Sequence, residues 1–396
     1  MRKSRYYRPL LYLLLLSCLY LLFRLAPVLF SPEVMPADDF GHFWASGKLL
    51  LSGENPYNAA RLVALQQQIS GGAYATEVTS LTLNPPWALS LLLPFSLLPY
   101  QAARLAWLIM GILLILLSIR AIWSLYQGDP HKLWAAWLVG LTFAPTISVL
   151  TKGQVSVWLL AATAGFVLLV EKRMNYWLAA LCCVLLSIKP QLFYLFWPAV
   201  GLWMLYSRKW KLLATSLCIL IAATLPVLAL NPAIFSQYLA AMQAYPASAW
   251  ATPTIGAYLR FFWLGEANFW VQYVPGLICA VWLIFRYHKH RHTWKWSEEV
   301  PALLLLSLIT SPYAWTYDQV LLIPAILAAS AHLIRVRTWL SLAFWLIYLG
   351  INILDLILHI KLSEFWFLWL APAYTIWYLG VNGWLRKHNT QLPSQP

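Results

Sequence analysis

Two adjacent acids, Asp38 and Asp39, follow the first apolar segment of a chain that has only 13 acidic residues. Charge beside a bilayer is costly and neighbouring carboxylates repel each other, so stability alone does not explain this pair. His42 lies about one helical turn after Asp39, where its ring can hydrogen-bond the carboxylate or be solvated. We interpret residues 38–57 as the start of an active site on one face of a membrane.

A lysine separates two apolar segments further along the chain. Segments 176–188 and 190–206 are each too short for a full membrane span, and they meet at Lys189 and Pro190. Proline cannot donate a backbone hydrogen bond, so the carbonyl groups freed at this break need water or another donor. We predict that Lys189 faces a wet cavity. The alternative is a lysine whose ammonium group extends to the membrane surface.

The composition is that of a membrane protein with several spans. Of 396 residues, 61% are hydrophobic and 10% are charged, which leaves too little polar surface for a soluble globule. The net charge of +14 does not indicate nucleic-acid binding, because the basic residues form small separate clusters. The five cysteines lie in apolar segments without paired spacing, which argues against disulfides and metal sites. We predict one all-α membrane domain, residues 1–396, with neither metal nor cofactor.

The apolar segments predict about twelve passes through the membrane, located by their apolar length and by the basic residues that end them; a full span needs roughly 20 apolar residues. The first, 10–30, lacks a convincing cleavage site and is predicted to remain as an anchor. An outer loop, 31–84, follows it, and segment 85–126 then combines a short interfacial helix with a span. The later spans are predicted near residues 133–150, 155–170, 176–188, 190–206, 212–230, 269–285, 300–311, 318–334, 338–359 and 365–385.

The charges predict which side of the membrane each turn faces. Basic clusters such as Lys172/Arg173 and Arg335/Arg337 indicate cytoplasmic turns, with cytoplasmic termini and a short tail at 386–396. Most acids, including Asp39, fall on the opposite side. We therefore predict an active site on the outer face of a bacterial inner membrane, away from nucleotide sugars and ATP. Amphipathic stretches 58–70 and 232–244 are predicted to lie on that surface.

Several motifs resemble those of glycosyltransferase family 87, in the same order. DDFGHFWASGKLLLSGENPY (38–57) is similar to the acidic first-loop signature of that family. Four later segments of this chain resemble later blocks of the family: NPPWALSLLLPFSLLPYQAARLAW (84–107), KGQVSVWLL (152–160), IKPQ (188–191) and SPYAWTYDQVLLIPA (311–325). One departure concerns the last block: mycobacterial members tend to carry histidines where this chain has Tyr317 and Asp318.

The resemblance implies a C-type glycosyltransferase fold and transfer of a sugar from a polyprenyl-phosphate donor to an acceptor hydroxyl. Characterised members are largely mannosyltransferases, which favours mannose among the hexoses. Because the lipid phosphate leaves as a stable anion, the reaction needs one base and cations for the phosphate, but no general acid. Asp39 matches the motif aspartate and is the predicted base. One carboxylate and direct displacement predict inversion at the anomeric carbon.

The remaining motif residues have predicted binding roles with open alternatives. Asp38 either orients the acceptor, favours the protonated form of Asp39 by like-charge repulsion, or caps the helix that follows it. Lys189, Arg260 and Lys152 are predicted to bind the donor phosphate.

Four further residues are predicted to contact the substrates: His42, Trp44, Trp315 and Asp318. An aromatic face can cover the apolar face of a hexose, although tryptophan is also common at membrane interfaces. Asp318 either contacts the acceptor or caps a membrane helix. The implied partners are membrane lipid, a polyprenyl-phosphate-linked sugar and a glycolipid or glycan acceptor.

Two other functions compete with this interpretation. A secondary transporter could use Lys189 and Asp355 for ion coupling, but the chain shows no internal repeat and its acidic outer loop occurs once. A lipid-linked glycan ligase or polymerase would also act on polyprenyl carriers outside the cell. Such enzymes usually have their large outer loop late in the chain, whereas here it follows the first span.

Overall fold

The computed structural model describes Leu19, Phe23 and residues 39–69, 81–172, 175–336 and 338–389. It is 80% helix, and no strand occurs among these residues, which confirms the all-α prediction. Asp38 and most of the predicted first span, 10–30, lie outside the described residues.

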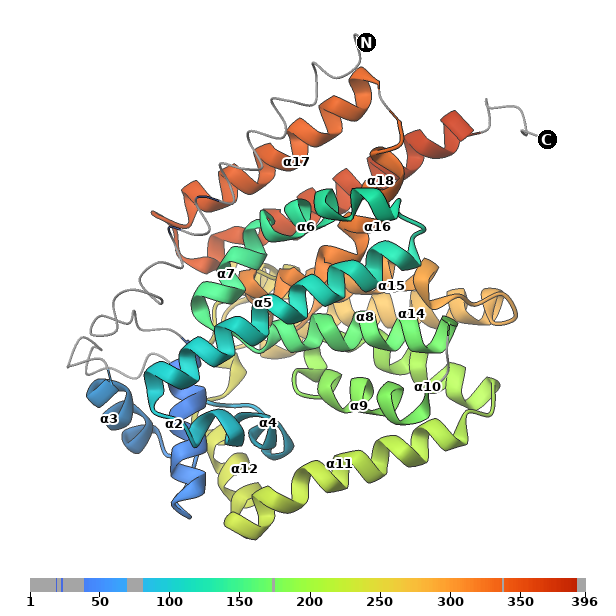
Figure 1. The fold of residues 1–396 in the computed structure, drawn as a ribbon. Coiled ribbons are helices and arrows are strands. Elements are labelled where there is room, and N and C mark those ends of the chain that lie inside the picture. Colours follow the sequence, from blue (N-terminus) through green and yellow to red (C-terminus); the bar gives the residue numbers. More distant parts are fainter. Residues whose placement is uncertain are drawn as a thin grey trace.

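The chain folds into α-helices (Figure 1), with short helical turns (η) between some of them. Their bounds are α2 Asp39–Leu51, α3 Ala59–Ile69, α4 Pro86–Ser96, α5 Tyr100–Leu125, η2 Pro130–Lys132, α6 Leu133–Leu141, α7 Ala144–Lys152, α8 Ser156–Lys172, α9 Tyr176–Leu186, η3 Pro190–Phe193, α10 Phe196–Tyr206, α11 Trp210–Leu230, α12 Ile234–Ala244, η4 Ala247–Ala249, α13 Ile255–Leu259, η5 Arg260–Leu264, η6 Phe269–Tyr273, α14 Val274–His290, α15 Trp296–Thr310, η7 Thr316–Leu322, α16 Ile323–Leu333, α17 Trp339–Leu358, η8 Glu364–Trp369 and α18 Leu370–Asn389.

Four described helices are long and apolar enough to cross a membrane: α5, α11, the continuous segment Phe269–His290, and α17. Helices α6 and α7 make a fifth candidate as a pair bent by 65°. At this bend Asn352 Oδ1 accepts a hydrogen bond from the backbone N–H of Ala144 at 2.6 Å, so a donor freed by the bend keeps a partner. The chain is therefore a helical membrane protein.

The break predicted at Lys189 is confirmed. Helix α9 ends at Leu186 and α10 begins at Phe196, and both are only 11 residues long. Lys189 and the turn η3 lie between them. Pro190 opens η3, where its missing N–H costs nothing.

The two ends of the helical bundle differ in their residues. Figure 1 shows α2, α3, α4 and α12 gathered near the start of α5. At the other end of α5, Lys172 donates to Ser124 O at 3.2 Å, Arg335 donates to Gln127 O, and Tyr126 Oη donates to Ser297 O at 2.8 Å. Turns that the sequence assigns to the cytoplasm thus meet at the end remote from α2.

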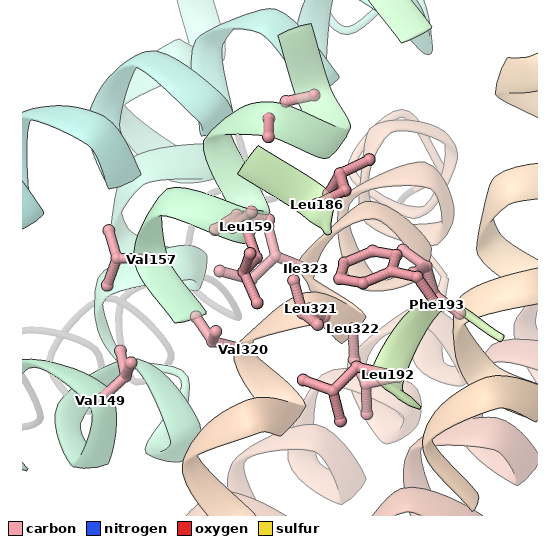
Figure 2. Close-up of a cluster of buried hydrophobic side chains, with 14 of the residues drawn as sticks. Val149, Val157, Leu159, Leu186, Leu192, Phe193, Val320, Leu321, Leu322 and Ile323 are labelled. Atoms are coloured by element: carbon pink, nitrogen blue, oxygen red, sulfur yellow. The ribbon is translucent and has the colours of Figure 1, made fainter. Parts of the chain in front are cut away.

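A cluster of buried apolar side chains packs between several helices and turns (Figure 2). Its members come from α7, α8, α9, η3, η7 and the start of α16, and Leu159, Leu186, Leu192, Phe193 and Val320 are fully buried. Each polar turn between these elements is therefore flanked in sequence by apolar side chains fixed in the core. This packing holds residues 152–156, 189 and 318 in place.

Candidate active site

A cavity of about 570 Å³ opens at the end of the bundle that carries α2. Charged or polar side chains reach it from α2, from the turn between α7 and α8, from the break after α9, and from η7 and η8. Its lining residues include Asp39, His42, Lys152, Gln154, Lys189, Asp318 and Glu364, together with the aromatic residues Phe43, Trp87, Tyr238, Tyr245, Trp250, Tyr313, Trp315 and Tyr317.

Asp39 is presented to the cavity by the first turn of α2. A carboxylate there is favoured by the positive end of the helix dipole. The next residue, Phe40, is fully buried, and its ring centroid lies 5.2 Å from that of Trp107 on α5. Anchoring Phe40 in this way fixes the direction of the neighbouring Asp39.

A chain of hydrogen bonds connects two of the cavity's acids, Asp39 and Asp318, through a lysine. Gln154 Nε2 donates to Asp39 Oδ2 at 2.8 Å, and Gln154 Oε1 accepts from Lys189 Nζ at 3.1 Å. Lys189 Nζ also forms an ion pair with Asp318 Oδ1 at 2.8 Å. Asp39, which is 115 residues away from Gln154 in sequence, is thereby linked to Asp318.

The Lys189–Asp318 pair is deeply buried, since 8% of Lys189 and 1% of Asp318 are exposed. Asp318 Oδ1 also accepts from Ser156 Oγ, and its Oδ2 accepts from the backbone N–H of Trp315 at 3.1 Å. Asp318 thus caps the start of η7 with one carboxylate oxygen, Oδ2, and pairs with Lys189 through the other, Oδ1. Extra hydrogen bonds of this kind are what a buried ion pair needs to offset its desolvation.

The second lysine of the cavity is more open. Lys152 forms an ion pair with Glu364, and 37% of its side chain is exposed. Glu364 in turn accepts from the backbone N–H and the hydroxyl of Thr316 at 3.2 and 2.9 Å. Lys152 Nζ and Lys189 Nζ lie 5.1 and 4.9 Å from the centre of the Tyr317 ring, so both ammonium groups contact one aromatic side chain.

The turn that carries Lys152 and Gln154 depends on Gly153. This residue ends α7 with a left-handed φ of 68°, which glycine adopts without steric cost. Arg104, which is fully buried, donates to the carbonyls of Leu150 and Thr151 at 3.1 and 2.9 Å and so satisfies the end of the same helix. These bonds hold the turn against α5, and the Arg104 guanidinium also lies 5.8 Å from the centre of the Phe40 ring of α2.

Gly153→Ala is expected to lower the free energy of unfolding by more than the roughly 1–2 kcal/mol of left-handed strain. An added Cβ would lie 2.6 Å from Phe40 Cβ, a contact that neither backbone can easily relieve. Thermal unfolding of the purified variants would measure the loss. Gly201→Ala is the matched control, because nothing lies within 4 Å of its added Cβ and alanine favours a helix. Equal stability of the two variants would contradict the expectation.

His42 is a neutral group on the cavity wall. Burial is the main cause that lowers its pKa, to about 4, and the nearby Asp39 opposes this change only in part. Its Nδ1 is hydrogen-bonded to Thr82 Oγ1 at 2.9 Å, and that hydroxyl also contacts Ser46 Oγ at 2.6 Å. At neutral pH, His42 therefore offers hydrogen bonds without a charge.

Two residues selected from the sequence do not line the cavity. The guanidinium group of Arg260 is buried and donates to Glu266 O, Gln272 Oε1 and Ser248 O at 2.6, 2.7 and 2.6 Å, which ties together the segment between α12 and α14. Trp44 is 8% exposed, and its Nε1 donates to Leu98 O at 3.0 Å. Both side chains serve packing between elements, and neither is among the cavity residues.

The structure adds residues to the site that the sequence does not single out. Gln154 lines the cavity, and Ser156 contacts Lys189 and Asp318 without lining it. Both follow Lys152 in the KGQVS segment, where their uncharged side chains give no sign of a role. Glu364 is one of the acids on the predicted outer side of the membrane, and the sequence gives it no further role. No signal in the sequence pairs these residues with Asp39, Lys189 or Lys152.

This arrangement combines a carboxylate, two ammonium groups and aromatic side chains around one space. The carboxylate can accept a proton, the cations can bind an anion, and aromatic rings can pack against a sugar. Among the described residues, no group of three or more His, Cys, Asp or Glu side chains is placed to hold a metal ion.

Comparison with known proteins agrees with the resemblance seen in the motifs. The sequence model of glycosyltransferase family 87 matches residues 82–312, a segment that includes Lys152, Gln154 and Lys189. Asp39 and Asp318 lie outside it. No curated protein and no solved structure matches the chain. Because the matched segment covers more than half of the 396 residues, the chain belongs to glycosyltransferase family 87.

Proposed function

We propose that this glycosyltransferase transfers a hexose, with mannose favoured, from a polyprenyl-phosphate donor to a hydroxyl of a glycolipid or glycan. The single observation that carries the proposal is the presence of the Asp39 carboxylate and the Lys152 and Lys189 ammonium groups around one cavity. This reaction requires a base for the acceptor hydroxyl and positive charge near the departing phosphate.

The proposed site faces the outer side of a bacterial inner membrane. Basic turns gather at the bundle end remote from α2, and such turns favour the cytoplasm. The cavity at the α2 end then opens outside, where lipid-linked donors replace nucleotide sugars. The proposed architecture is a C-type fold with about twelve spans, in which short helices such as α3 and α12 lie at the membrane surface.

In the proposed mechanism, Asp39 accepts the proton of the acceptor hydroxyl. The hydroxyl oxygen forms a bond to the anomeric carbon as the bond from that carbon to the phosphate oxygen breaks. The electron pair of the broken bond stays on the lipid phosphate, which leaves as an anion beside the lysines. Direct displacement by one nucleophile inverts the anomeric configuration.

Lys152 is the side chain proposed to contact the phosphate directly. It is the more exposed lysine of the cavity, and its described partner is Glu364, whereas Lys189 already donates to Gln154, Ser156 and Asp318. Trp87 and Trp315 are proposed to pack against the sugars, since both line the cavity.

Lys152→Met is expected to raise the donor KM by about 10-fold or more, because a charge-assisted hydrogen bond contributes about 1.5–3 kcal/mol. The change in kcat should be smaller, since the base remains. Initial rates at varied donor concentration would measure both. Lys295→Met, which removes an exposed lysine paired with Glu298, is the control and should match the native chain. A donor KM unchanged by Lys152→Met would contradict the assignment.

The reaction class is tested by incubating purified protein with a panel of synthetic polyprenyl-phosphate hexoses and a membrane extract as acceptor source. The proposal expects consumption of one donor and a product with inverted anomeric configuration. Retained configuration would exclude direct displacement. Consumption of no donor by folded native protein would refute the donor class.

A further inference from the structure

Lys189 has no N–H left for a substrate in this arrangement. An ammonium group has three donors and no acceptor. Lys189 Nζ donates to Gln154 Oε1, Ser156 Oγ and Asp318 Oδ1 at 3.1, 3.3 and 2.8 Å, and the residue is only 8% exposed. A phosphate could gain a hydrogen bond from Lys189 only by displacing one of these acceptors.

The bond to Lys189 decides how the Gln154 amide is oriented. Because a lysine cannot accept a hydrogen bond, the amide oxygen of Gln154 must face Lys189 and the amide nitrogen must face the other way. The nitrogen then meets Asp39, whose Oδ2 accepts from it at 2.8 Å. The opposite orientation would set the amide oxygen against a carboxylate oxygen and the amide nitrogen against an ammonium group.

We propose that Lys189 and Gln154 are positioning residues for the base Asp39, and that Lys189 is not a phosphate ligand. Asp318 and Ser156 hold the ammonium group, the ammonium group orients the amide, and the amide donates an N–H to the Asp39 carboxylate. This inference rests on the proposed function in treating Asp39 as the base. It assigns the direct phosphate contact to Lys152 alone.

Gln154→Met and Gln154→Glu test the link from the amide to Asp39. Methionine removes both hydrogen bonds at similar size, whereas glutamate keeps an oxygen for Lys189 but turns a second carboxylate oxygen toward Asp39. We expect kcat to fall by about 10-fold or more with a donor KM within about 3-fold of native. The acid limb of the kcat–pH profile should move to higher pH in both variants, and further in Gln154→Glu, because ionised Asp39 loses a donor or gains a repulsion.

Gln272→Met is the matched control for these variants. Gln272 is also buried between a cation and a backbone acceptor: its Oε1 accepts from Arg260 Nη1 at 2.7 Å and its Nε2 donates to Pro312 O at 2.6 Å. It does not line the cavity. A merely structural role for Gln154 would give both methionine variants a lower melting temperature and an unchanged pH profile, and that result would overturn the inference.

The role of Lys189 is tested by a double-mutant cycle. Lys189→Met is made together with Asp318→Asn, so that no unpaired charge stays buried, and the pair is combined with Gln154→Met. If Lys189 acts through Gln154, the triple variant has the same kcat as the Lys189→Met/Asp318→Asn double variant. The donor KM of that double variant stays within about 3-fold of native. A donor KM raised more than about 10-fold with kcat retained would show a phosphate ligand and overturn the inference.

Infrared titration gives a result that does not require turnover. The carboxylate band that is present in the spectrum of the native chain and missing from that of Asp39→Asn belongs to Asp39. The pH midpoint at which this band titrates is then compared between the native chain and Gln154→Glu. An upward shift supports the inference even if no donor of the panel is consumed, so that only the proposed function fails. An unchanged midpoint overturns the inference even when native protein is active.

Discussion

Asp39→Asn is expected to lower kcat for hexose transfer by about 10²- to 10⁴-fold, the usual contribution of a positioned general base. The amide cannot accept the hydroxyl proton. It has the shape of the native side chain, and its oxygen can still accept from Gln154 Nε2, which donates to Asp39 at 2.8 Å. The fold and donor binding should therefore persist. Release of labelled hexose from the donor would measure the loss of turnover, and a separate donor-binding assay would show that binding is retained.

Asp129→Asn provides the control for this substitution. Asp129 lies at the turn η2 and accepts from the backbone N–H of His131 at 3.0 Å, away from the cavity residues. Its asparagine variant should transfer hexose at the native rate. Turnover of Asp39→Asn within about 3-fold of native would exclude Asp39 as the base.

Lys189→Met is expected to lower the free energy of unfolding by about 3–5 kcal/mol, the usual result of removing one partner of a buried ion pair. Asp318 would then remain 1% exposed and without its cation. Unfolding in detergent solution, followed by tryptophan fluorescence, would measure the change. Adding Asp318→Asn should recover much of the loss, because an amide is less costly to bury than an unpaired carboxylate.

The exposed pair Lys295–Glu298 serves for comparison, since 66% and 63% of its side chains are exposed. Lys295→Met should change the free energy of unfolding by no more than about 1 kcal/mol. If Lys189→Met were as stable as Lys295→Met, Lys189 and Asp318 would not form a buried charged pair in the folded protein.

Features that depend on neighbouring residues could be predicted from the sequence. Apolar runs and their limits located the membrane-capable helices, including Trp210–Leu230 and Trp339–Leu358, because spanning a bilayer requires about 20 apolar residues in succession. Pro190 marked the break after α9, since proline removes a backbone donor wherever it lies. The ordered motifs indicated glycosyltransferase family 87 because they are local strings of residues.

The partners of the charged side chains came from tertiary structure alone. Asp318 lies 129 residues after Lys189, and Glu364 lies 212 residues after Lys152. A basic residue type does not reveal whether its charge faces a cavity, as Lys152 does, or loop carbonyls, as Arg260 does. Such pairings depend on how apolar helix faces pack. Sequence thus determined the helices, the membrane setting and the family, whereas packing decided which distant polar groups meet around Asp39.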